Sequence, residues 1–472
     1  MGRTQGPGRG WGMVGVALTV SGCAVVGPDY VKPAAIVPAQ YKEIKGWKFG
    51  RPRDEYEKGA WWEVFHDPEL STLEAQVAIS NQTLKADEAN YREAQALIAQ
   101  ARAQLFPTLT LNASIERGNN ASGLVLTTLS GQANASWTPD LWGKVRRTIE
   151  GQAAGAQASA ADLANAKLSA QSALATAYYQ LRETDSLHDL LDNTVKQYKR
   201  ALDITQNQYQ AGTAARSDVI TAQALVLAAQ AQEINTEVAR GQFEHAIAVL
   251  IGRPPAGLSI RHGALTHDPP HIPLRLPSTL LERRPDIAAA ERTMQQQNAQ
   301  IGVAIAAYYP DITLTGLIGG AGTLGVKSIA GANPVWSIAA SFAQTLFNGG
   351  LTDAQVAAAR ATYEASVATY RQTVLAAFGQ VEDQLVAIRV LASEESVQVE
   401  AVKAAEQAVQ IALNEYRAGT QNFTTVVTAE ATALSDEESL LSTREQRVEA
   451  AVALVVALGG GWTEAQLPAE TQ

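Results

Sequence analysis

Two stretches of the chain, FPTLTLNASI at residues 106–115 and YPDITLTGLI at residues 309–318, indicate how it folds. Each opens with an aromatic residue and a proline, and the proline ends the helix expected before it, at about residues 84–105 and 286–307. After each proline, apolar and polar residues alternate, which is the period-2 pattern of a half-apolar strand. Each stretch is followed by a Gly-rich loop and a second strand that can pair with the first. The sequence therefore predicts two hairpins, with strands at about 107–116, 132–142, 310–319 and 334–347.

The two stretches are part of an internal duplication. Three landmarks recur after nearly constant offsets of 203, 205 and 207 residues, so each half is expected to carry a helix, a strand pair, a very long helix, a turn and a helix. The landmarks are Phe106-Pro107 and Tyr309-Pro310, Leu141-Trp142-Gly143 and Leu346-Phe347-Asn348-Gly349, and Tyr209-Gln210-Ala211-Gly212-Thr213 and Tyr416-Arg417-Ala418-Gly419-Thr420.

Long segments without proline follow each hairpin. Small apolar residues, mostly alanine, recur in them at spacings of three and four, which predicts helices at about 144–210 and 216–252, and at about 351–415 and 423–458. A helix of about 65 residues is about 100 Å long. Periodicity alone would also fit an elongated coiled coil, so a structural periplasmic coiled-coil lipoprotein is an alternative hypothesis.

The N-terminal residues carry the pattern of a bacterial lipoprotein signal peptide. Cys23, the only cysteine of 472 residues, ends the sequence Val20-Ser21-Gly22-Cys23, which follows a short apolar run behind Arg3 and Arg9. The run is too short to span a bilayer as a helix. We expect residues 1–22 to be removed and Cys23 to carry a covalent lipid, which leaves no thiol for a disulfide, metal site or redox couple. The alternative is a stray cysteine after a plain signal peptide.

Charge and hydropathy restrict the partners. The formal charge of −10 becomes −12 when the two arginines of the signal peptide are removed, which argues against nucleic acid or an anionic lipid surface as a partner.

After residue 22 no run of 18 apolar residues occurs, so strands must make any membrane crossing. Four strands cannot close a barrel, because known single-chain barrels start at about eight. Two or three chains must therefore pool their hairpins.

Several further segments are similar to the outer-membrane efflux proteins of the TolC family, in the lipoprotein branch that includes OprM and NodT. They span nearly the whole mature chain. These segments are Cys23-Ala24-Val25-Val26-Gly27-Pro28-Asp29-Tyr30 with Pro33, Trp61-Trp62 with Phe65, Asp67, Pro68 and Leu70, Asp140-Leu141-Trp142-Gly143-Lys144-Val145-Arg146-Arg147, Leu281-Glu282-Arg283-Arg284-Pro285-Asp286, and Leu458-Gly459-Gly460-Gly461-Trp462.

The resemblance implies a mainly α fold with a transmembrane β-barrel. Three chains, a homotrimer, would form a barrel of twelve strands, four from each chain, joined to a periplasmic α-barrel of twelve helices. The protein would be lipid-anchored in the outer membrane, with a large periplasmic extension. It would act as the exit duct for small molecules of a tripartite efflux system, together with a periplasmic adaptor and an inner-membrane pump of the RND type. The alternative within transport is the duct of a type I protein-secretion system.

The duplication organises the chain into six segments. They are a signal peptide at 1–22, an extended segment and first helix at 23–83, a first repeat at 84–260, a connector at 261–283, a second repeat at 284–458 and a tail at 459–472.

The candidate site residues lie at the ends of the long helices. Gly212 and Gly419 permit the left-handed backbone that reverses the chain. The resemblance implies that these turns, Ala211-Gly212-Thr213 and Ala418-Gly419-Thr420, also dock the adaptor. It further implies an acidic ring that closes the pore, but Thr428 stands at the corresponding position. Asp218 or Glu430 could supply a substitute, or the constriction could be mainly steric.

Two other motifs suggest chemistry but fit structural roles better. Residues 320–328 nearly match a phosphate-binding loop, yet no helix signal follows, and we expect an extracellular hairpin loop. His262, His267 and His271 could hold zinc in principle, but their Pro-rich surroundings indicate a connector between the repeats. No catalytic set stands out. We therefore expect no enzyme activity, no metal and no cofactor other than the lipid on Cys23.

Overall fold

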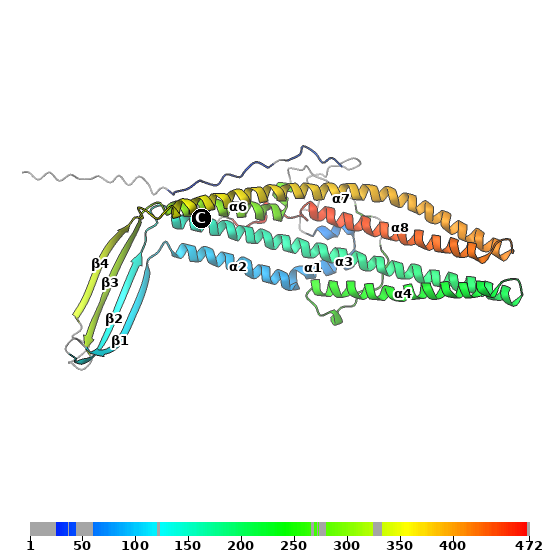
Figure 1. Ribbon diagram of the computed structural model, residues 1–472, viewed down its shortest axis with the longest axis horizontal. Coiled ribbons are helices and arrows are strands. Elements are labelled where there is room, and N and C mark those ends of the chain that lie inside the picture. Colours follow the sequence, from blue (N-terminus) through cyan, green and yellow to red (C-terminus); the bar gives the residue numbers. More distant parts are fainter. Residues whose placement is uncertain are drawn as a thin grey trace, which may run out of the picture. The chain divides into compact units, whose positions relative to one another are not determined.

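The structure is a computed structural model. It describes residues 25–35, 37–43, 60–119, 123–265, 269–270, 272, 280–323 and 333–469, so Cys23 and its expected lipid lie outside the described residues. The chain is mostly helical, with strands β1 to β4 (Figure 1). Among the described residues, no helix combines the length and the apolar character that crossing a membrane requires.

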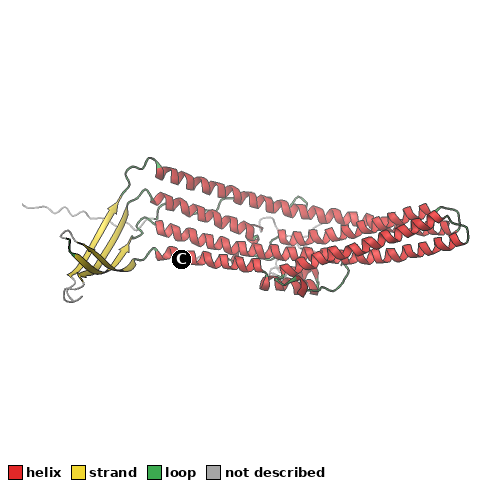
Figure 2. Cartoon of the chain, turned by 60° about the horizontal axis from the view of Figure 1, so that its bottom comes forward, coloured by secondary structure: helices red, strands yellow, loops and turns green. Residues whose placement is uncertain are grey.

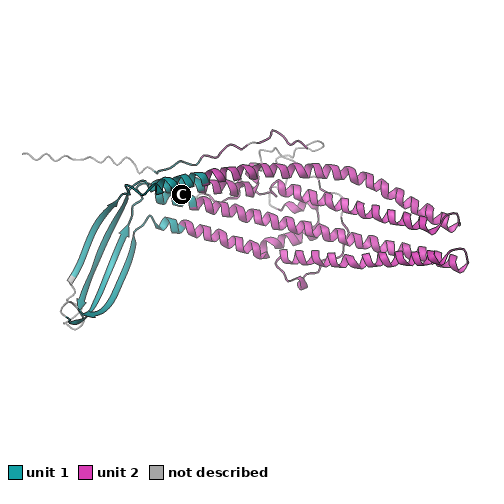
Figure 3. Cartoon of the chain, viewed as in Figure 1, with its two compact units in different colours: residues 1–30, 99–151, 297–361 teal, residues 31–98, 152–296, 362–472 magenta. Residues whose placement is uncertain are grey.

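The chain divides into two compact units that cut across the two sequence repeats (Figure 3). One unit comprises residues 1–30, 99–151 and 297–361 and contains the sheet. The other comprises residues 31–98, 152–296 and 362–472 and contains most of the helical residues. Each unit draws on both halves of the duplication, because equivalent elements of the two repeats lie in the same unit.

The strands form one antiparallel sheet, drawn in yellow in Figure 2. Their order is β1-β2-β3-β4, as labelled in Figure 1. β1 (Thr108–Asn119) pairs with β2 (Val125–Trp137), β2 pairs with β3 (Asp311–Thr323), and β3 pairs with β4 (Asn333–Ala343). The two hairpins of the two repeats are therefore joined side by side through β2 and β3.

The strand bounds differ from the expected ones in all four strands. β1 continues to Asn119, beyond the expected 116. β2 lies earlier than the expected 132–142, because its polar and Gly-containing first half pairs with both β1 and β3 although it lacks apolar alternation. β3 continues to Thr323, so residues 320–323 belong to a strand and not to a hairpin loop. Ala321 is paired on both sides, with Ser130 and with Asn333. Residues 324–328 of that stretch lie outside the described residues. β4 ends at Ala343, before the expected 347.

The helices repeat in the two halves with equal lengths. α3 (Lys144–Gln210) and α7 (Leu351–Arg417) each contain 67 residues, and α4 (Arg216–Leu250) and α8 (Phe423–Ala457) each contain 35. Their bounds differ from the expected ones by two residues or fewer. A length of 67 residues corresponds to about 100 Å. The remaining helical segments are η2 (Trp61–Phe65), α1 (Pro68–Ser80), α2 (Gln82–Ala103), η3 (Pro255–Gly257), α5 (Leu280–Arg283), α6 (Pro285–Ala306) and η6 (Glu464–Gln466).

Small residues allow the long helices to pack closely. Ala161 of α3 is fully buried against Ala288 and Ala289 of α6, and Trp462 covers this cluster. Near the far ends of the long helices, larger apolar residues pack together around Phe423. The regularly spaced alanines thus form contacts between helices, as their spacing predicts.

Candidate functional site: a two-faced sheet and paired helix turns

One face of the sheet is apolar and exposed. In the register of the ladders, Leu109 lies opposite Ala135 and Ile318 lies opposite Trp336. Leu111 is 80% exposed and Ile338 is 83% exposed. The apolar residues that share this face are Leu109, Leu111, Ala113, Ile115, Leu129, Ala133, Ala135, Trp137, Ile312, Leu314, Ile318, Trp336, Ile338, Ala340 and Phe342. A contiguous exposed apolar surface of this kind indicates contact with lipid or with another chain.

The opposite face of the sheet is mainly polar. Thr108, Thr110, Asn112, Ser114, Thr128, Ser130, Gln132, Asn134, Ser136, Asp311, Thr313, Thr315, Ser337 and Ser341 share it. Ser114 and Ser130 are joined by a hydrogen bond of 2.7 Å across the β1–β2 ladder. The apolar exceptions on this face are Leu126, Leu317 and Val335, with Ala321, Ala339 and Ala343. A sheet with lipid on one side and water on the other has this distribution.

Both edges of the sheet are unpaired within the described chain. β1 pairs only with β2, and β4 pairs only with β3. An edge strand of 11 or 12 residues presents a row of free N–H and C=O groups that another strand can pair with. The chain thus carries two complementary edges of one unfinished sheet.

Aromatic residues gather where the strands meet the helices. Trp142 stacks on Tyr309 with ring centroids 4.9 Å apart, and its indole N–H donates to the carbonyl of Pro310 at 2.8 Å. Trp137 donates in the same way to the carbonyl of Leu105 at 2.9 Å. Amphipathic rings of this kind are enriched at the boundaries of the lipid layer.

The first described residues after Cys23 lie against this junction. The backbone N–H of Val26 donates to the carbonyl of Trp142 at 3.1 Å. The buried guanidinium of Arg147 donates to the carbonyls of Val26 and Gly27 and to Asp29. A Cβ on Gly27 would lie 2.4 Å from the Cα of Gly302, so only glycine allows this approach. The segment is therefore held at the start of α3.

The two turns at the ends of the long helices have the same geometry. Gly212 and Gly419 have φ angles of +78° and +72°. The N–H of Thr213 donates to the carbonyl of Gln208 at 2.9 Å, and the equivalent bond from Thr420 to Glu415 measures 3.0 Å. These are the six-to-one bonds of a glycine-terminated helix. All residues of 211–213 and 418–420 are exposed, and a Cβ at either glycine would meet no atom within 4 Å.

The three residues expected at a constriction occupy different environments. Thr428 is exposed, and its hydroxyl donates to the carbonyl of Thr424 in its own helix. Asp218 is half-buried in the first turn of α4. Glu430 is only 5% exposed, and burial raises its pKa to about 7. In the described chain no hydrogen bond or ion pair joins the three residues.

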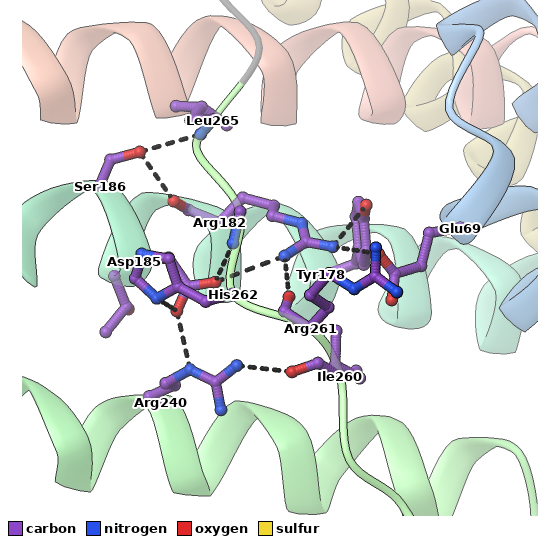
Figure 4. Close-up of polar contacts among 12 residues, drawn as sticks. Glu69, Tyr178, Arg182, Asp185, Ser186, Arg240, Ile260, Arg261, His262 and Leu265 are labelled. Atoms are coloured by element: carbon purple, nitrogen blue, oxygen red, sulfur yellow. Dashed lines mark hydrogen bonds and ion pairs between the residues drawn. The ribbon is translucent and has the colours of Figure 1, made fainter. Parts of the chain in front are cut away.

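A buried charge network links α1, α3, α4 and the connector (Figure 4). Asp185 of α3 is fully buried and accepts from Arg240 of α4 at 2.8 Å and from the N–H of Gly263 at 3.0 Å. Arg182 donates to Asp185 at 3.3 Å and to Glu69 of α1 at 2.6 Å. Sequence reasoning missed this network, because the charges that neutralise one another come from distant segments and share no motif.

The connector histidine that the structure describes belongs to the same network. The Nδ1 and Nε2 atoms of His262 lie 3.3 Å from Asp185 and 3.1 Å from Asp189. His267 and His271 lie outside the described residues. Within the described ranges, no group of three or more His, Cys, Asp and Glu side chains is placed to hold a metal ion.

The fold defines the chain as one subunit of an outer-membrane channel. Its long helices measure about 100 Å, its sheet has two different faces and free edges, and the turns at its helix ends are exposed. The family model described as outer membrane efflux protein matches residues 74–253 and 276–460, and the chain belongs to this family. It is an outer-membrane protein. The expected fold class is confirmed, because the chain is mainly helical, has four strands of an outer-membrane channel and carries an internal duplication.

Known relatives match over almost their whole length. The toluene efflux pump outer membrane protein TtgC of Pseudomonas putida is 28% identical over 95% of this chain and 94% of its own. The solvent efflux pump outer membrane protein SrpC of Pseudomonas putida is 30% identical over 95% of this chain and 97% of its own. The solved outer-membrane channel OprN has a TM-score of 0.83 and 29% identity, covering 93% of this chain and 99% of that one.

Proposed function

We propose that three copies of this chain form the exit duct through which an efflux system releases small molecules across the outer membrane. The observation that carries the proposal is the sheet with one apolar face, one polar face and two unpaired edges. Pairing of β4 of one chain with β1 of the next satisfies both edges and encloses the polar face. Three chains with four strands each then contribute twelve strands to one barrel.

The strand lengths suit such a barrel. Strands of 11 to 13 residues extend about 36 to 43 Å at about 3.3 Å per residue. At a tilt of about 45° they rise about 25 to 30 Å, which matches the apolar band of an outer-membrane barrel. The apolar face would meet lipid and the polar face would line the water-filled pore.

A lipid on Cys23 would anchor the same region of the protein. Val25 follows Cys23 by two residues, which span at most about 7 Å, and it lies against Gly143 at the aromatic junction between strands and helices. A lipid at that position would enter the membrane beside the barrel. Each buried methylene of the lipid would contribute about 0.8 kcal/mol to the anchoring.

The two exposed turns are the proposed docking residues for a periplasmic adaptor. Their shared backbone geometry means that one kind of adaptor surface can fit both Ala211-Gly212-Thr213 and Ala418-Gly419-Thr420. The adaptor would connect the duct to an inner-membrane pump of the RND type. Because a duct lets solute move only down its gradient, the pump supplies the energy.

Small molecules are the proposed cargo, since relatives are named for efflux of toluene and solvents. Closure of the periplasmic end is assigned to the surroundings of Thr428 and Asp218, which reach the surface of the chain. Glu430 is enclosed within the single chain, which speaks against its role in an acidic ring.

The test is cysteine crosslinking across the proposed barrel seam. A cysteine replaces Ser341 in β4, and a second one is placed in turn at Thr110, Asn112 or Ser114 in β1, on the same polar face. We expect oxidation to yield covalent trimers for at least one pair, and none when Ser341→Cys is combined with a cysteine at Glu400 of α7. Absence of crosslinks at every β1 position would refute closure by three chains.

A further inference from the structure

A cavity of about 760 Å³ lies between α3, α7 and α8 in the helical unit. The residues of α3 that line it end at Ile204, seven residues before the turn at 211–213. Three carboxyl groups, Glu406, Glu430 and Glu437, lie on its wall together with several glutamine side chains. None of them belongs to the turns or to the sheet.

Glu430 lines this cavity with one carboxylate oxygen that has no partner in the described structure. The residue is 95% buried, since 5% of its surface is exposed, and its Oε2 atom makes no hydrogen bond in the described structure. Burying an ionised carboxylate without a cation is costly. Burial accordingly raises the pKa of Glu430 to about 7, so that a cation bound nearby would stabilise its ionised form.

A second acidic position lies two helical turns along α8. Glu437 follows Glu430 by seven residues, which places it on the same face at a distance of about 10.5 Å along the helix axis. Burial raises the pKa of Glu437, and the charge of Glu406 on α7 raises it further. Both residues line the same cavity. No ion pair with Glu406, Glu430 or Glu437 occurs among the described residues.

Part of the cavity wall is apolar, alongside the glutamines and arginines that also line it. Val409 and Leu413 of α7 and Ala433 of α8 line it. Within the described ranges, no group of three or more His, Cys, Asp and Glu side chains is placed to hold one metal ion. An elongated cation with charged ends and an apolar middle matches this distribution.

We propose that the cavity binds a linear diamine or polyamine. One ammonium group lies at Glu430, the other lies beside Glu406 and Glu437, and the methylene chain covers the apolar wall. Such a ligand contacts α3, α7 and α8 at once and holds these helices together near the turns. The site goes beyond the proposed duct, because binding here requires no transport.

Two arginines predict the direction in which a further substitution changes the binding affinity. Arg200 of α3 and Arg417 of α7 line the same cavity and repel a cation. Arg417 donates to Asn414, and neither arginine pairs with the three carboxyls in the described structure. Removing the charge of Arg417 should therefore strengthen binding, whereas removing a carboxylate should weaken it.

The groups that face Glu430 also determine how binding depends on pH. They are Tyr198 and Arg200 on α3, Glu406 and Arg417 on α7, and Glu437 and Glu438 on α8. Burial raises the pKa values of Glu430, Glu437 and Glu438, and these carboxyls lose protons as the pH rises. Binding should therefore be tighter at pH 8 than at pH 6.

The experiment is calorimetric titration of the purified full-length protein in detergent with spermidine at pH 8. We expect saturable binding that Glu430→Gln and Glu437→Gln each weaken by about tenfold or more, the effect of a lost charged hydrogen bond. Arg417→Gln should bind more tightly. Glu394→Gln, which changes an exposed carboxylate of α7, serves as the control and should bind like the original protein.

Three results would overturn the proposal. They are no saturable binding to the original protein, equal affinity of Glu430→Gln and Glu437→Gln to the control, and equally strong competition by magnesium, which would show charge screening only. Circular dichroism and size-exclusion chromatography verify that each variant is folded. If Glu430→Gln fails to fold, the opposite shifts expected for Glu437→Gln and Arg417→Gln decide the question.

Discussion

Glu74 of α1 offers a direct test of how burial of a carboxyl limits stability. The residue lies in the apolar stripe of its helix with Leu70, Leu73 and Val77, and it is fully buried. Neither of its carboxylate oxygens has a hydrogen-bond partner in the described structure. Burial raises the pKa of Glu74 to about 9. The native protein therefore holds this side chain neutral at pH 7.

The pH dependence follows from the two pKa values of Glu74. The folded carboxyl stays protonated up to about pH 9, whereas the unfolded one ionises above its ordinary value of 4.5. Between these values unfolding releases a proton, so stability falls as the pH rises. The 2.5 pH units between 4.5 and 7 correspond to about 3 kcal/mol of lost stability, with about 6 kcal/mol lost near pH 9. Below pH 4.5 the carboxyl is protonated in both states, so its ionisation costs no stability.

Glu74→Gln removes this penalty, because the amide keeps the shape of the side chain and does not ionise. We expect the variant to be more stable by about 3 kcal/mol at pH 7, by about 6 kcal/mol at pH 9, and by less than about 1 kcal/mol at pH 5. In a chain of this length 3 kcal/mol corresponds to about 3 °C in melting temperature. The assay is thermal unfolding in detergent followed by circular dichroism at the three pH values.

The exposed Glu63 of η2 provides the matched control, and Glu63→Gln should leave the melting temperature unchanged at all three pH values. A gain for Glu74→Gln that is the same at pH 5 and pH 9 would refute the reasoning, because then ionisation is not its origin. A loss of stability at pH 7 would refute it as well.

Further expected outcomes concern the turns and the buried network. Gly212→Val combined with Gly419→Val should abolish export while trimers still assemble, because valine is strained at positive φ but meets no atom there. The control is Gly241→Val in α4, where a Cβ also meets no atom within 4 Å. Undiminished export by the double variant would contradict the docking proposal. Asp185→Asn should lower the melting temperature by about 3 to 5 °C, because it removes the buried anion that Arg182 and Arg240 share, at a cost of about 3 to 5 kcal/mol. Glu69→Gln, which removes a more exposed partner, should cost less than about 1 kcal/mol, and equal melting temperatures of the two variants would exclude a dominant role of Asp185.

Local sequence signals predicted the long helices and the places where β1 and β3 begin. Pro107 and Pro310 act within a few residues by removing a backbone donor, and Gly212 and Gly419 act by permitting a left-handed backbone. Such signals need no information about the rest of the chain. The family resemblance and the two-faced strands followed from the same short-range patterns.

The errors occurred where pairing overrides local preference. The first half of β2 and residues 320–323 of β3 are rich in Gly and polar residues and do not alternate clearly, yet both are paired strands. Gly131 lies opposite Gly320, a partner 189 residues away. A ladder of backbone hydrogen bonds forms there because its neighbours already hold the strands in register.

The sequence by itself determined the order of the elements, the duplication, the two faces of the sheet and the turns, because each depends on residues close to one another along the chain. Only the tertiary structure decided which charges are compensated. Asp185 meets Arg240 across 55 positions of sequence, while Glu74 and Glu430 remain without a cation. Compensation depends on packing between distant helices, and periodicity shows only that a side chain faces inward, not which group it meets there.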